Sequence, residues 1–512
     1  MNISVLLRNA ARTYPDRPAI SVGEETRFTY GQLAHRVSKL AGGLLAQGLR
    51  SGDRVVVAMS NRPTYLEVLF GIWHAGLVAV PVNAKLHPRE VAFIAENCQA
   101  ALCLVTADHA DGIAAALASD AGAARSTRVI CVDHTEYEKL MREPVEAAAS
   151  DRDALAWIFY TSGTTGRPKG AMLSHLNLQL MTWSYLCDFD LLTPQDCLLH
   201  LGPQSHAAGL LSLAHVAKAS NNILPSSGGV DPDEIASLIN RYDRMAFFAA
   251  PTMLRRMLDS RDMANCNIDH VTTIIGGGAP FYASDVRRTL AAYGPRFTNG
   301  YGQGECPCTI TAMPKHLYTS ELSDEQLASV GIARSGVEVR VVDDEGRELP
   351  TDGIGEIVVR SPIVMSGYWN NPEASKGALK DGWLHTGDLG AMDGRGFLSL
   401  KDRSKDLIIS GGSNIYPREV EDVLLVHECV AEVAVVGQPD AEWGESVVAF
   451  VVSKAGERAT PEQLDLLCLD NLARYKRPKQ YVFVDALPRN NTGKVMKNDL
   501  RALVSNPRSG KD

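Results

Sequence analysis

Short β-rich runs of apolar residues alternate with segments of helical periodicity in the first half of the chain. The β-rich runs include RVVVAMS (54–60), VAVPVN (78–83) and ALCLVTA (101–107), and TYLEVLFGIWHAG (64–76) and PREVAFIAENC (88–98) lie between them. A strand, helix, strand order of this kind is typical of a mostly parallel sheet that is covered by helices. We therefore predict an α/β fold with a large N-terminal domain of helix-covered, mostly parallel sheets.

Two later helices have starts that are marked by polar residues. Asp231, Pro232 and Glu234 predict the N-cap, the first turn and the capping-box acid of the helix EIASLINRY. Residues 460–463, TPEQ, repeat this pattern near the C-terminus. Both positions are predicted to begin a helix.

The pattern changes after about residue 335. The runs VEVRVVDDEGRELP (337–350) and GEIVVRS (355–361) are β-rich and separated by turn residues, which predicts a small antiparallel or barrel-like unit. A second change follows KDRSKD (401–406), where VLLVHECVAEVAVVG (423–437) and SVVAFVVSK (446–454) begin a compact α/β segment. We place the boundary of a small C-terminal α/β domain at this second change.

Size and charge exclude several classes of protein. The 512 residues exceed the size at which one hydrophobic core keeps growing, so at least two domains are expected. A formal net charge of -9 provides no basic surface for nucleic acid, so small anions require local binding groups. No apolar stretch approaches the ~20 residues of a membrane span, and Arg8, Arg12 and Asp16 interrupt the N-terminus where a signal peptide would be apolar.

Cysteine usage indicates the cellular compartment. The 10 cysteines have no regular spacing, and a chain of this size builds its core without disulfides. Cys306 and Cys308, the closest pair, lack a second pair or a histidine cluster, so we interpret them as packing residues. We predict a cytoplasmic protein, monomeric or homodimeric, with no membrane span and no nucleic-acid partner.

The loop YTSGTTGRPKG (160–170) is the first candidate for chemistry. It is not a Walker A loop, because a proline stands five residues after its first glycine and its lysine is followed by glycine. Two other glycine-rich segments, GGGAPF (276–281) and GYGQGE (300–305), lack the G-x-G-x-x-G pattern. By composition alone, a solvated connector is the commoner interpretation of such a loop.

The spacing of this loop changes that interpretation. It matches, nearly residue for residue, the phosphate-binding signature of the superfamily of acyl- and aryl-CoA synthetases, aminoacyl-adenylation domains and luciferases. Seven further segments resemble motifs of this superfamily, in the family's order and over most of the chain. These segments are GPQSHAAGL (202–210), FFAAPTML (247–254), GGGAP (276–280), NGYGQGE (299–305), GWLHTGDLG (382–390), DRSKDLIISGGSNIYPREVE (402–421) and PRNNTGK (488–494).

The resemblance implies a ligase that works in two steps. A carboxylate attacks the α-phosphate of ATP to give an acyl-adenylate and pyrophosphate, and a thiol then takes the acyl group. It also implies an AMP-binding N-terminal domain (1–402), a hinge (403–406) with its pivot at Lys405, and a mobile C-terminal domain (407–512). No carrier-protein module follows in the sequence, which favours a free-standing ligase that uses coenzyme A.

The resemblance assigns the phosphate and metal contacts. Glycines let backbone N–H groups approach phosphate oxygens, and hydroxyls add further donors. Glu305 and Thr161 are implied to hold Mg²⁺, a hard cation that binds carboxylates together with nucleotide phosphates. A solvated lysine is the alternative for Lys169. The implied phosphate contacts are Thr161, Ser162, Gly163, Thr164, Thr165 and Lys169.

The nucleoside contacts follow from the same resemblance. Tyr301 is implied to lie against the adenine, and Asp388 is implied to accept hydrogen bonds from the ribose hydroxyls. One departure is Gly304, where the family usually has threonine; the missing hydroxyl leaves one contact unassigned and predicts a larger acid pocket. The implied nucleotide-binding residues outside the phosphate loop are Gly278, Ala279, Pro280, Asn299, Tyr301, Gly302, Asp388, Arg403 and Lys494.

The resemblance places further residues in the C-terminal domain. Lys494 resembles the lysine that bridges the substrate carboxylate and the α-phosphate, although an exposed tail lysine is the alternative for TGK alone. Gly411, Gly412 and Ser413 resemble the loop that lies along the pantetheine arm of coenzyme A. Rotation at the hinge would bring first Lys494 and then this loop to the reaction.

Aminoacyl-adenylating relatives need an acidic side chain to pair with the ammonium group of their substrate, and the segment between Gly202 and Leu213 contains none. This favours an acid with an uncharged tail, fatty or aromatic. His206 resembles a gate at the carboxylate end and is a candidate catalytic residue, with a satisfied core histidine as the alternative. A non-catalytic adenylate-binding protein, a luciferase-like enzyme and a stand-alone adenylation domain stay open. The candidate acid-binding residues are His206, Ala207, Gly209, Gly277, Gly278 and Gly304.

Overall fold

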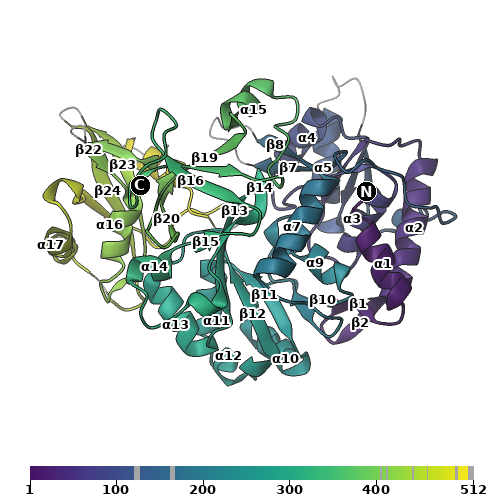
Figure 1. The fold of residues 1–512 in the computed structure, drawn as a ribbon, viewed down its shortest axis with the longest axis horizontal. Helices are drawn as coiled ribbons and strands as arrows, with labels where there is room; N and C mark the ends of the chain where they lie inside the picture. The colour runs from purple at the N-terminus through teal and green to yellow at the C-terminus, as the bar shows by residue number, and fades with distance from the viewer. Residues whose placement is uncertain are drawn as a thin grey trace. The chain divides into compact units, whose positions relative to one another are not determined.

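The computed structural model divides into two compact units, drawn together in Figure 1. Unit 1 comprises Met1–Val339 and Val359–His385, and unit 2 comprises Arg340–Val358 and Thr386–Asp512. The boundary falls within three strands, β16, β17 and β19, so the chain passes from one unit to the other along strands. The structure describes residues 1–119, 127–161, 168–403, 406–410, 413–440, 443–457, 459–490 and 494–505.

Unit 1 contains a six-stranded sheet built from the alternating pattern of the first 174 residues. The first five strands in its order are parallel, and β8 closes it as an antiparallel hairpin with β7. The predicted parallel sheet is therefore confirmed. In spatial order the strands are β6 (Arg128–Cys131), β5 (Leu102–Val105), β3 (Arg54–Ala58), β4 (Val78–Pro81), β7 (Leu155–Thr161) and β8 (Lys169–Ser174).

Unit 1 also contains a nine-stranded sheet. Its six central strands are parallel, while β2 at one edge and β14 and β15 at the other are antiparallel. In spatial order the strands are β15 (Ile332–Ala333), β14 (Cys306–Ala312), β13 (Phe297–Gln303), β12 (Val271–Gly276), β11 (Met245–Ala249), β9 (Cys197–Leu199), β10 (Asn221–Leu224), β1 (Pro18–Val22) and β2 (Glu25–Thr29).

Helices cover these sheets, as the alternating pattern predicts. Helix α3 ends close to its predicted end, and Gly76, two residues after His74, takes the positive φ of 74° that favours glycine at a helix end. The helices of unit 1 are α1 (Val5–Thr13), α2 (Tyr30–Ala46), α3 (Thr64–His74), α4 (Pro88–Asn97), α5 (Ala107–Ser119), α6 (Thr135–Glu138), α7 (His175–Asp188), α8 (Ala207–Leu210), α9 (Ser212–Ala217), α10 (Pro232–Arg241), α11 (Pro251–Leu258), α12 (Arg261–Asn265), α13 (Ala283–Tyr293), α14 (Asp324–Ala328) and α15 (Pro372–Ala378).

A five-stranded sheet forms where the sequence predicted a small antiparallel or barrel-like unit. Its order is β16, β17, β19, β18, with β20 beside β19, and the pairs β18–β19 and β19–β20 are antiparallel. The strands are β16 (Glu338–Val342), β17 (Gly355–Arg360), β18 (Leu379–Lys380), β19 (Trp383–Met392) and β20 (Leu398–Arg403).

The C-terminal part of unit 2 is the predicted small α/β domain. Strands β23 and β24 form a long antiparallel pair, and β25 adds to β24 in parallel. Helices α16 and α18 both pack against β23. The elements are β21 (Ile408–Ser410), β22 (Ser413–Ile415), α16 (Pro417–Leu424), β23 (Val430–Asp440), β24 (Gly444–Ser453), α17 (Pro461–Asn471), β25 (Gln480–Phe483) and α18 (Lys497–Ser505).

One of the two predicted capping boxes forms and the other does not. Thr460 accepts from the Gln463 N–H, and the Gln463 side chain accepts from the Thr460 N–H at 2.8 Å. Asp231 caps α10 as predicted, but the Glu234 carboxylate instead accepts from the Ser226 and Ser227 N–H groups. The predicted capping-box role of Glu234 is therefore wrong, because two other unsatisfied backbone donors lie within reach of its side chain.

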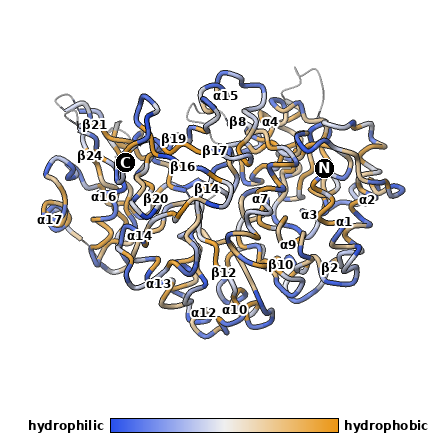
Figure 2. Tube along the Cα trace, viewed as in Figure 1, coloured by the Kyte–Doolittle hydropathy of each residue, from blue (hydrophilic) through white to orange (hydrophobic). Residues whose placement is uncertain are grey.

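Apolar side chains of the strands form the core. Figure 2 shows hydrophobic residues along the strands and hydrophilic residues in the outer loops. The side chains of Val56, Phe247, Ile274 and Phe297 are each 0% exposed. Among the residues that the structure describes, no helix is long and apolar enough to cross a membrane.

Two histidines are buried in this core near β9 and α9. His200 lies 3.1 Å from the Asn222 side-chain oxygen, and His215 lies 3.2 Å from the Tyr185 hydroxyl, measured from their Nε2 atoms. Burial lowers the pKa of His200 to about 4 and that of His215 to about 3. Both side chains are therefore neutral in the folded protein above pH 5.

We expect these histidines to make the protein sensitive to acid. Between about pH 4 and 6.5 the unfolded chain binds protons that the folded chain does not, so the free energy of unfolding falls as the pH falls. Going from pH 7.5 to 5, each histidine should contribute a loss of about 2 kcal/mol. Urea unfolding at both pH values measures this loss, and His215→Gln should show a smaller one; an equal loss in the variant would contradict the assignment.

Candidate active site

Four of the sequence motifs converge at one edge of the nine-stranded sheet. Strands β13, β12, β11 and β9 are consecutive and parallel, so their carboxyl ends lie at the same edge. The motif 202–210 follows β9, 247–254 contains the end of β11, 276–280 contains the end of β12, and 299–305 contains the end of β13. The carboxyl edge of parallel strands is where α/β proteins bind ligands.

A hydrogen bond joins this edge to the phosphate-loop motif. Thr161 is the last residue of β7, and its hydroxyl donates to Glu305 Oε1 at 3.2 Å. Tyr368 donates its hydroxyl to the same oxygen at 2.8 Å. Burial, and then the neighbouring Glu305 carboxylate, raise the pKa of Tyr368, so its hydroxyl keeps the proton that it donates. Glu305 itself is 9% exposed.

The phosphate loop is only partly described. Ser162, Gly163, Thr164 and Thr165 lie outside the described residues. Lys169 opens β8 directly opposite Thr161 in the β7–β8 hairpin, and its Nζ lies 5.5 Å from the ring centre of Tyr368. The described ends of the loop thus lie beside Glu305 and Tyr368.

Three candidate nucleotide contacts, Asn299, Tyr301 and Gly302, come from β13. Asn299 pairs with Gly276, the last residue of β12, and Tyr301 is 8% exposed. The Asn299 side-chain oxygen is buried and accepts no hydrogen bond from the described residues, a costly state that a donor would relieve. Gly302 leaves no room for a Cβ, which would lie 2.7 Å from the Cys308 nitrogen.

The loop after β12 contains three candidate residues on one accessible turn. Gly278 and Pro280 are exposed, and Ala279 is half-buried. Gly278 has a φ of +80°, in the region that favours glycine. The sequence GGGAP therefore forms a turn that only a glycine at 278 adopts without strain.

Gly304 lies against an aromatic side chain that the sequence analysis did not consider. A Cβ at this position would lie 2.5 Å from Phe159 Cδ1 and 2.6 Å from Thr161 Cγ2. Phe159 therefore occupies the space beside the glycine. The larger pocket that we predicted from the missing threonine does not form at this position, because the Phe159 ring fills it.

We expect Gly304→Ala to destabilise the protein by about 1 to 3 kcal/mol, because the new methyl overpacks against Phe159 and Thr161. The cost of Gly304→Ala should be smaller in a Phe159→Ala background, since the nearest clashing atom is then absent. Thermal unfolding measures both effects. Gly377→Ala is the matched control, because a Cβ there meets no atom within 4 Å; equal melting temperatures for the two alanine variants would contradict the clash.

The candidate acid-binding residues lie around two phenylalanines. The His206 ring packs edge-on against Phe159 with 5.4 Å between ring centres, and its Nδ1 lies 2.8 Å from the Ser205 hydroxyl. Phe248 lies beside the candidates Gly277 and Gly278, because a Cβ at either glycine would lie 3.3 or 3.4 Å from its ring. Apolar rings thus border both groups of candidates.

Packing explains one of these small residues. Ala207 and Gly209 belong to the short helix α8. A Cβ at Gly209 would lie 1.7 Å from the Gln204 carbonyl oxygen, so only glycine lets α8 pack on the preceding loop. Gly209 is buried, and its contact with an acid stays a prediction.

Unit 2 holds the remaining candidates. Asp388 on β19 is 8% exposed and lies directly opposite Arg403 of β20 in the antiparallel ladder. The structure therefore pairs the backbones of two residues that were predicted to bind the nucleotide. Lys494 is exposed, with its N–H donating to the Asn490 side chain at 2.9 Å. Ser413 opens β22, whereas Lys405, Gly411 and Gly412 lie outside the described residues.

Glu305 and Thr161 supply oxygen atoms of the kind that bind Mg²⁺. Both hydrogen bonds that Glu305 accepts from described side chains fall on Oε1. Magnesium is commonly held by one or two carboxylates together with phosphate oxygens. Within the described ranges no group of three or more His, Cys, Asp or Glu side chains gathers around one point.

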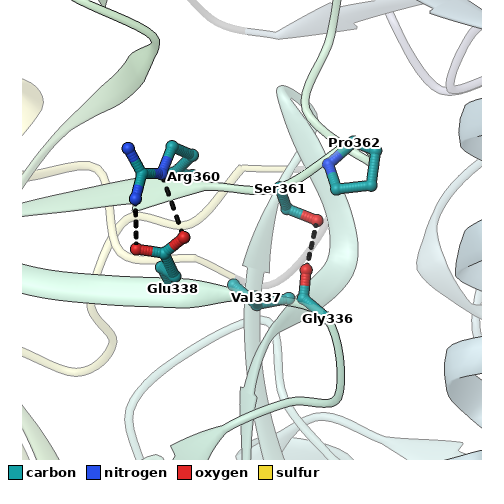
Figure 3. Close-up of a pocket in the computed structure, with 6 residues that line it drawn as sticks. All are labelled: Gly336, Val337, Glu338, Arg360, Ser361 and Pro362. Carbon is teal, nitrogen blue, oxygen red and sulfur yellow. Dashed lines mark hydrogen bonds and ion pairs between the residues drawn. The ribbon is translucent and has the colours of Figure 1, made fainter.

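A separate concave region of unit 1 has a volume of about 450 Å³ (Figure 3). Its most polar feature is the ion pair between Arg360 Nε and Glu338 Oε1 at 3.0 Å, which Figure 3 shows beside Ser361 and Gly336. None of its lining residues is a candidate site residue, and exposed ion pairs of this type contribute little stability.

Three aromatic residues near the site were missed by the sequence analysis: Phe159, Phe248 and Tyr368. Phe159 and Phe248 lie inside or next to recognised motifs, but their rotamers depend on packing. Tyr368 lies 63 residues after Glu305, in a segment that matched no motif we recognised. Only the fold, which packs this segment against both β8 and Glu305, brings its hydroxyl to the carboxylate.

Comparison with known proteins gives matches along nearly the whole chain. Residues 7–369 match the family model described as AMP-binding enzyme, and residues 419–494 match the AMP-binding enzyme C-terminal domain. The chain is 36% identical over 493 residues to a feruloyl-CoA synthase of an Amycolatopsis species, covering 96% of both proteins. It is 34% identical over 512 residues to the long-chain-fatty-acid–CoA ligase FadD13 of Mycobacterium tuberculosis, covering 98% of this chain and 99% of the relative.

A solved structure of ATP-bound MatB from Rhodopseudomonas palustris is similar over the same extent. The TM-score is 0.88 at 33% sequence identity, and the match covers 99% of this chain and 100% of MatB.

Proposed function

Because the chain belongs to the AMP-binding enzyme family, we propose that it is an ATP-dependent carboxylic acid–CoA ligase that works through an acyl-adenylate. Its acid, ATP and coenzyme A become acyl-CoA, AMP and pyrophosphate. One observation carries this proposal. The last residue of β7 and the acid that ends the NGYGQGE motif are hydrogen-bonded, and this contact supports a single site for the phosphates and the rest of the nucleotide.

The first step joins the acid to AMP. A carboxylate oxygen of the acid attacks the α-phosphorus of ATP, and the bond from that phosphorus to the bridging oxygen breaks to release pyrophosphate. Two anions approach each other, so donors must surround the phosphates. Thr161 and Lys169 supply a hydroxyl and a positive charge there, and Lys494 is proposed to neutralise the charge at the α-phosphate.

We propose that Glu305, with the Thr161 hydroxyl beside it, holds Mg²⁺ against the phosphates. The cation would supply charge neutralisation to the leaving pyrophosphate. Asp388 and Arg403 are proposed to hold the ribose, and their opposition in the β19–β20 ladder supports this role.

The second step transfers the acyl group to coenzyme A. The thiolate sulfur attacks the acyl carbon, a C–S bond forms, and AMP leaves with the oxygen that joined it to the carbon. We propose that a domain of residues 407–512 turns about a hinge at 403–406, which would exchange Lys494 for the segment around Ser413 between the two steps.

We propose a fatty or aromatic acid with an uncharged tail. The rings of Phe159 and Phe248 beside the candidate acid-binding residues support an apolar partner. The two relatives act, by their names, on ferulate and on long-chain fatty acids, which are both acids of this kind. A cytoplasmic location and a monomeric or homodimeric state stay predictions.

The test is exchange of labelled pyrophosphate into ATP with a panel of fatty and hydroxycinnamic acids, followed by AMP release with and without coenzyme A. Acid-dependent exchange with CoA-dependent turnover is the expected result. Exchange without any effect of coenzyme A would indicate another acceptor. Nucleotide binding with no exchange for any acid would indicate a non-catalytic adenylate-binding protein.

A further inference from the structure

Residues 365–369 connect the two halves of the candidate site. Met365 donates its N–H to the Glu305 carbonyl oxygen at 2.8 Å. The same segment pairs with β8, because Met172 N–H donates to the Gly367 oxygen at 2.9 Å and Trp369 N–H donates to the Gly170 oxygen at 2.8 Å. Main-chain hydrogen bonds therefore connect this segment both to Glu305, in the turn between β13 and β14, and to β8, the strand that follows the phosphate loop.

The side chains of the segment repeat this connection. Trp369 donates its ring N–H to the backbone carbonyl oxygen of Asn97 at 3.1 Å. Tyr160 of β7 donates its hydroxyl to the side-chain oxygen of Asn97 at 2.6 Å. The Tyr368 N–H donates to the Ser375 hydroxyl at 2.7 Å. The backbone on both sides of the Tyr368 side chain is thus fixed.

Tyr368 itself reaches the carboxylate. Its hydroxyl lies 2.8 Å from Glu305 Oε1, the oxygen that also accepts from Thr161. Two donors on one oxygen fix the rotation of a carboxylate about its last side-chain bond, because any turn breaks one of the two bonds. Glu305 would otherwise sample several orientations, and a metal ligand needs one.

We propose that Tyr368 is a positioning residue that orients the Glu305 carboxylate for the divalent cation bound with ATP. This inference rests on the proposed function and adds to it a residue from outside the recognised motifs. Positioning partners of metal ligands commonly change metal affinity by about 10- to 100-fold when removed. This role predicts that loss of the hydroxyl weakens binding of the metal ion and leaves metal-free nucleotide binding unchanged.

The test compares Tyr368→Phe with Trp369→Phe. The first removes the hydroxyl on Glu305, and the second removes one hydrogen bond of the same segment without a contact to Glu305. Binding of Mn²⁺ in the presence of a non-hydrolysable ATP analogue, followed by electron paramagnetic resonance, should weaken about tenfold in Tyr368→Phe only. The Mg²⁺ concentration for half-maximal pyrophosphate exchange should rise in parallel.

Binding of the ATP analogue in EDTA should be the same in both variants and the parent. Equal Mn²⁺ affinity in Tyr368→Phe and the parent would overturn the proposal, as would an equal loss in both variants, which would indicate a structural role of the segment. Absence of exchange in the parent would count against the ligase function, while the Mn²⁺ measurement would still decide the role of Tyr368. If Tyr368→Phe does not fold, Tyr368→Met, which also lacks the hydroxyl, should weaken Mn²⁺ binding similarly, and unchanged binding would overturn the proposal.

Discussion

Replacement of Lys494 by alanine should slow acyl-adenylate formation by a factor on the order of 10² to 10³. The lysine is proposed to neutralise the charge that accumulates when the acid oxygen approaches the α-phosphorus, and this charge is largest in the transition state. Lys494 is exposed, and substitutions at exposed positions usually change stability by less than about 0.5 kcal/mol, so the melting temperature should change little. Pyrophosphate exchange under saturating ATP and acid measures the effect.

The same variant tests the proposed hinge. Thioester formation from a synthetic acyl-adenylate and coenzyme A should proceed at the parent rate, because the lysine would have left the site by the second step. Lys479→Ala, another exposed lysine of unit 2, is the matched control and should be active in both half-reactions. Equal losses of Lys494→Ala in both half-reactions would contradict a movement between the steps.

Replacement of Glu305 by glutamine should lower kcat/KM for ATP by a factor on the order of 10², through loss of a charge that holds the cation. The amide oxygen can still accept hydrogen bonds from Thr161 and Tyr368, so the local packing is retained. The effect should therefore be electrostatic and should persist at saturating acid. Steady-state rates at increasing Mg²⁺ measure it, with partial recovery expected at high Mg²⁺.

Glu338→Gln is the control for this second prediction. This variant also removes a negative charge, and with it the ion pair between Glu338 and Arg360. Glu338, however, lines the separate concave region of Figure 3. Its activity should equal that of the parent. A Glu305→Gln variant with parent activity and an unchanged Mg²⁺ requirement would exclude Glu305 as the metal ligand.

The sequence predicted the architecture well because its signals are local. Runs such as RVVVAMS and helices such as 64–76 are fixed by the periodicity of their own side chains, and the structure differs from them by one or two residues at the ends. The capping box at Thr460 formed because both of its partners lie within one helical turn. Glu234 did not follow the same rule, since a loop eight residues away in sequence offered its carboxylate two competing donors.

The candidate site was predicted in part for the same reason. Motif spacing identified Glu305, Thr161, Asp388 and Arg403, and the structure brings the first two into contact and the last two into opposition on neighbouring strands. The larger acid pocket that we predicted from the missing threonine at position 304 does not form there. Phe159, the neighbour of Gly304, is 145 residues earlier, and only strand packing decides which side chain fills that space.

The order of residues by itself determined the family, the parallel sheets and the types of group at each motif, because these depend on spacing along the chain. Tertiary structure alone decided that Phe159 fills the space beside Gly304 and that Tyr368 donates to Glu305. Those contacts arise from the packing of segments that are distant in sequence, and a hydrogen bond of 2.8 Å exists only after the fold has fixed both partners.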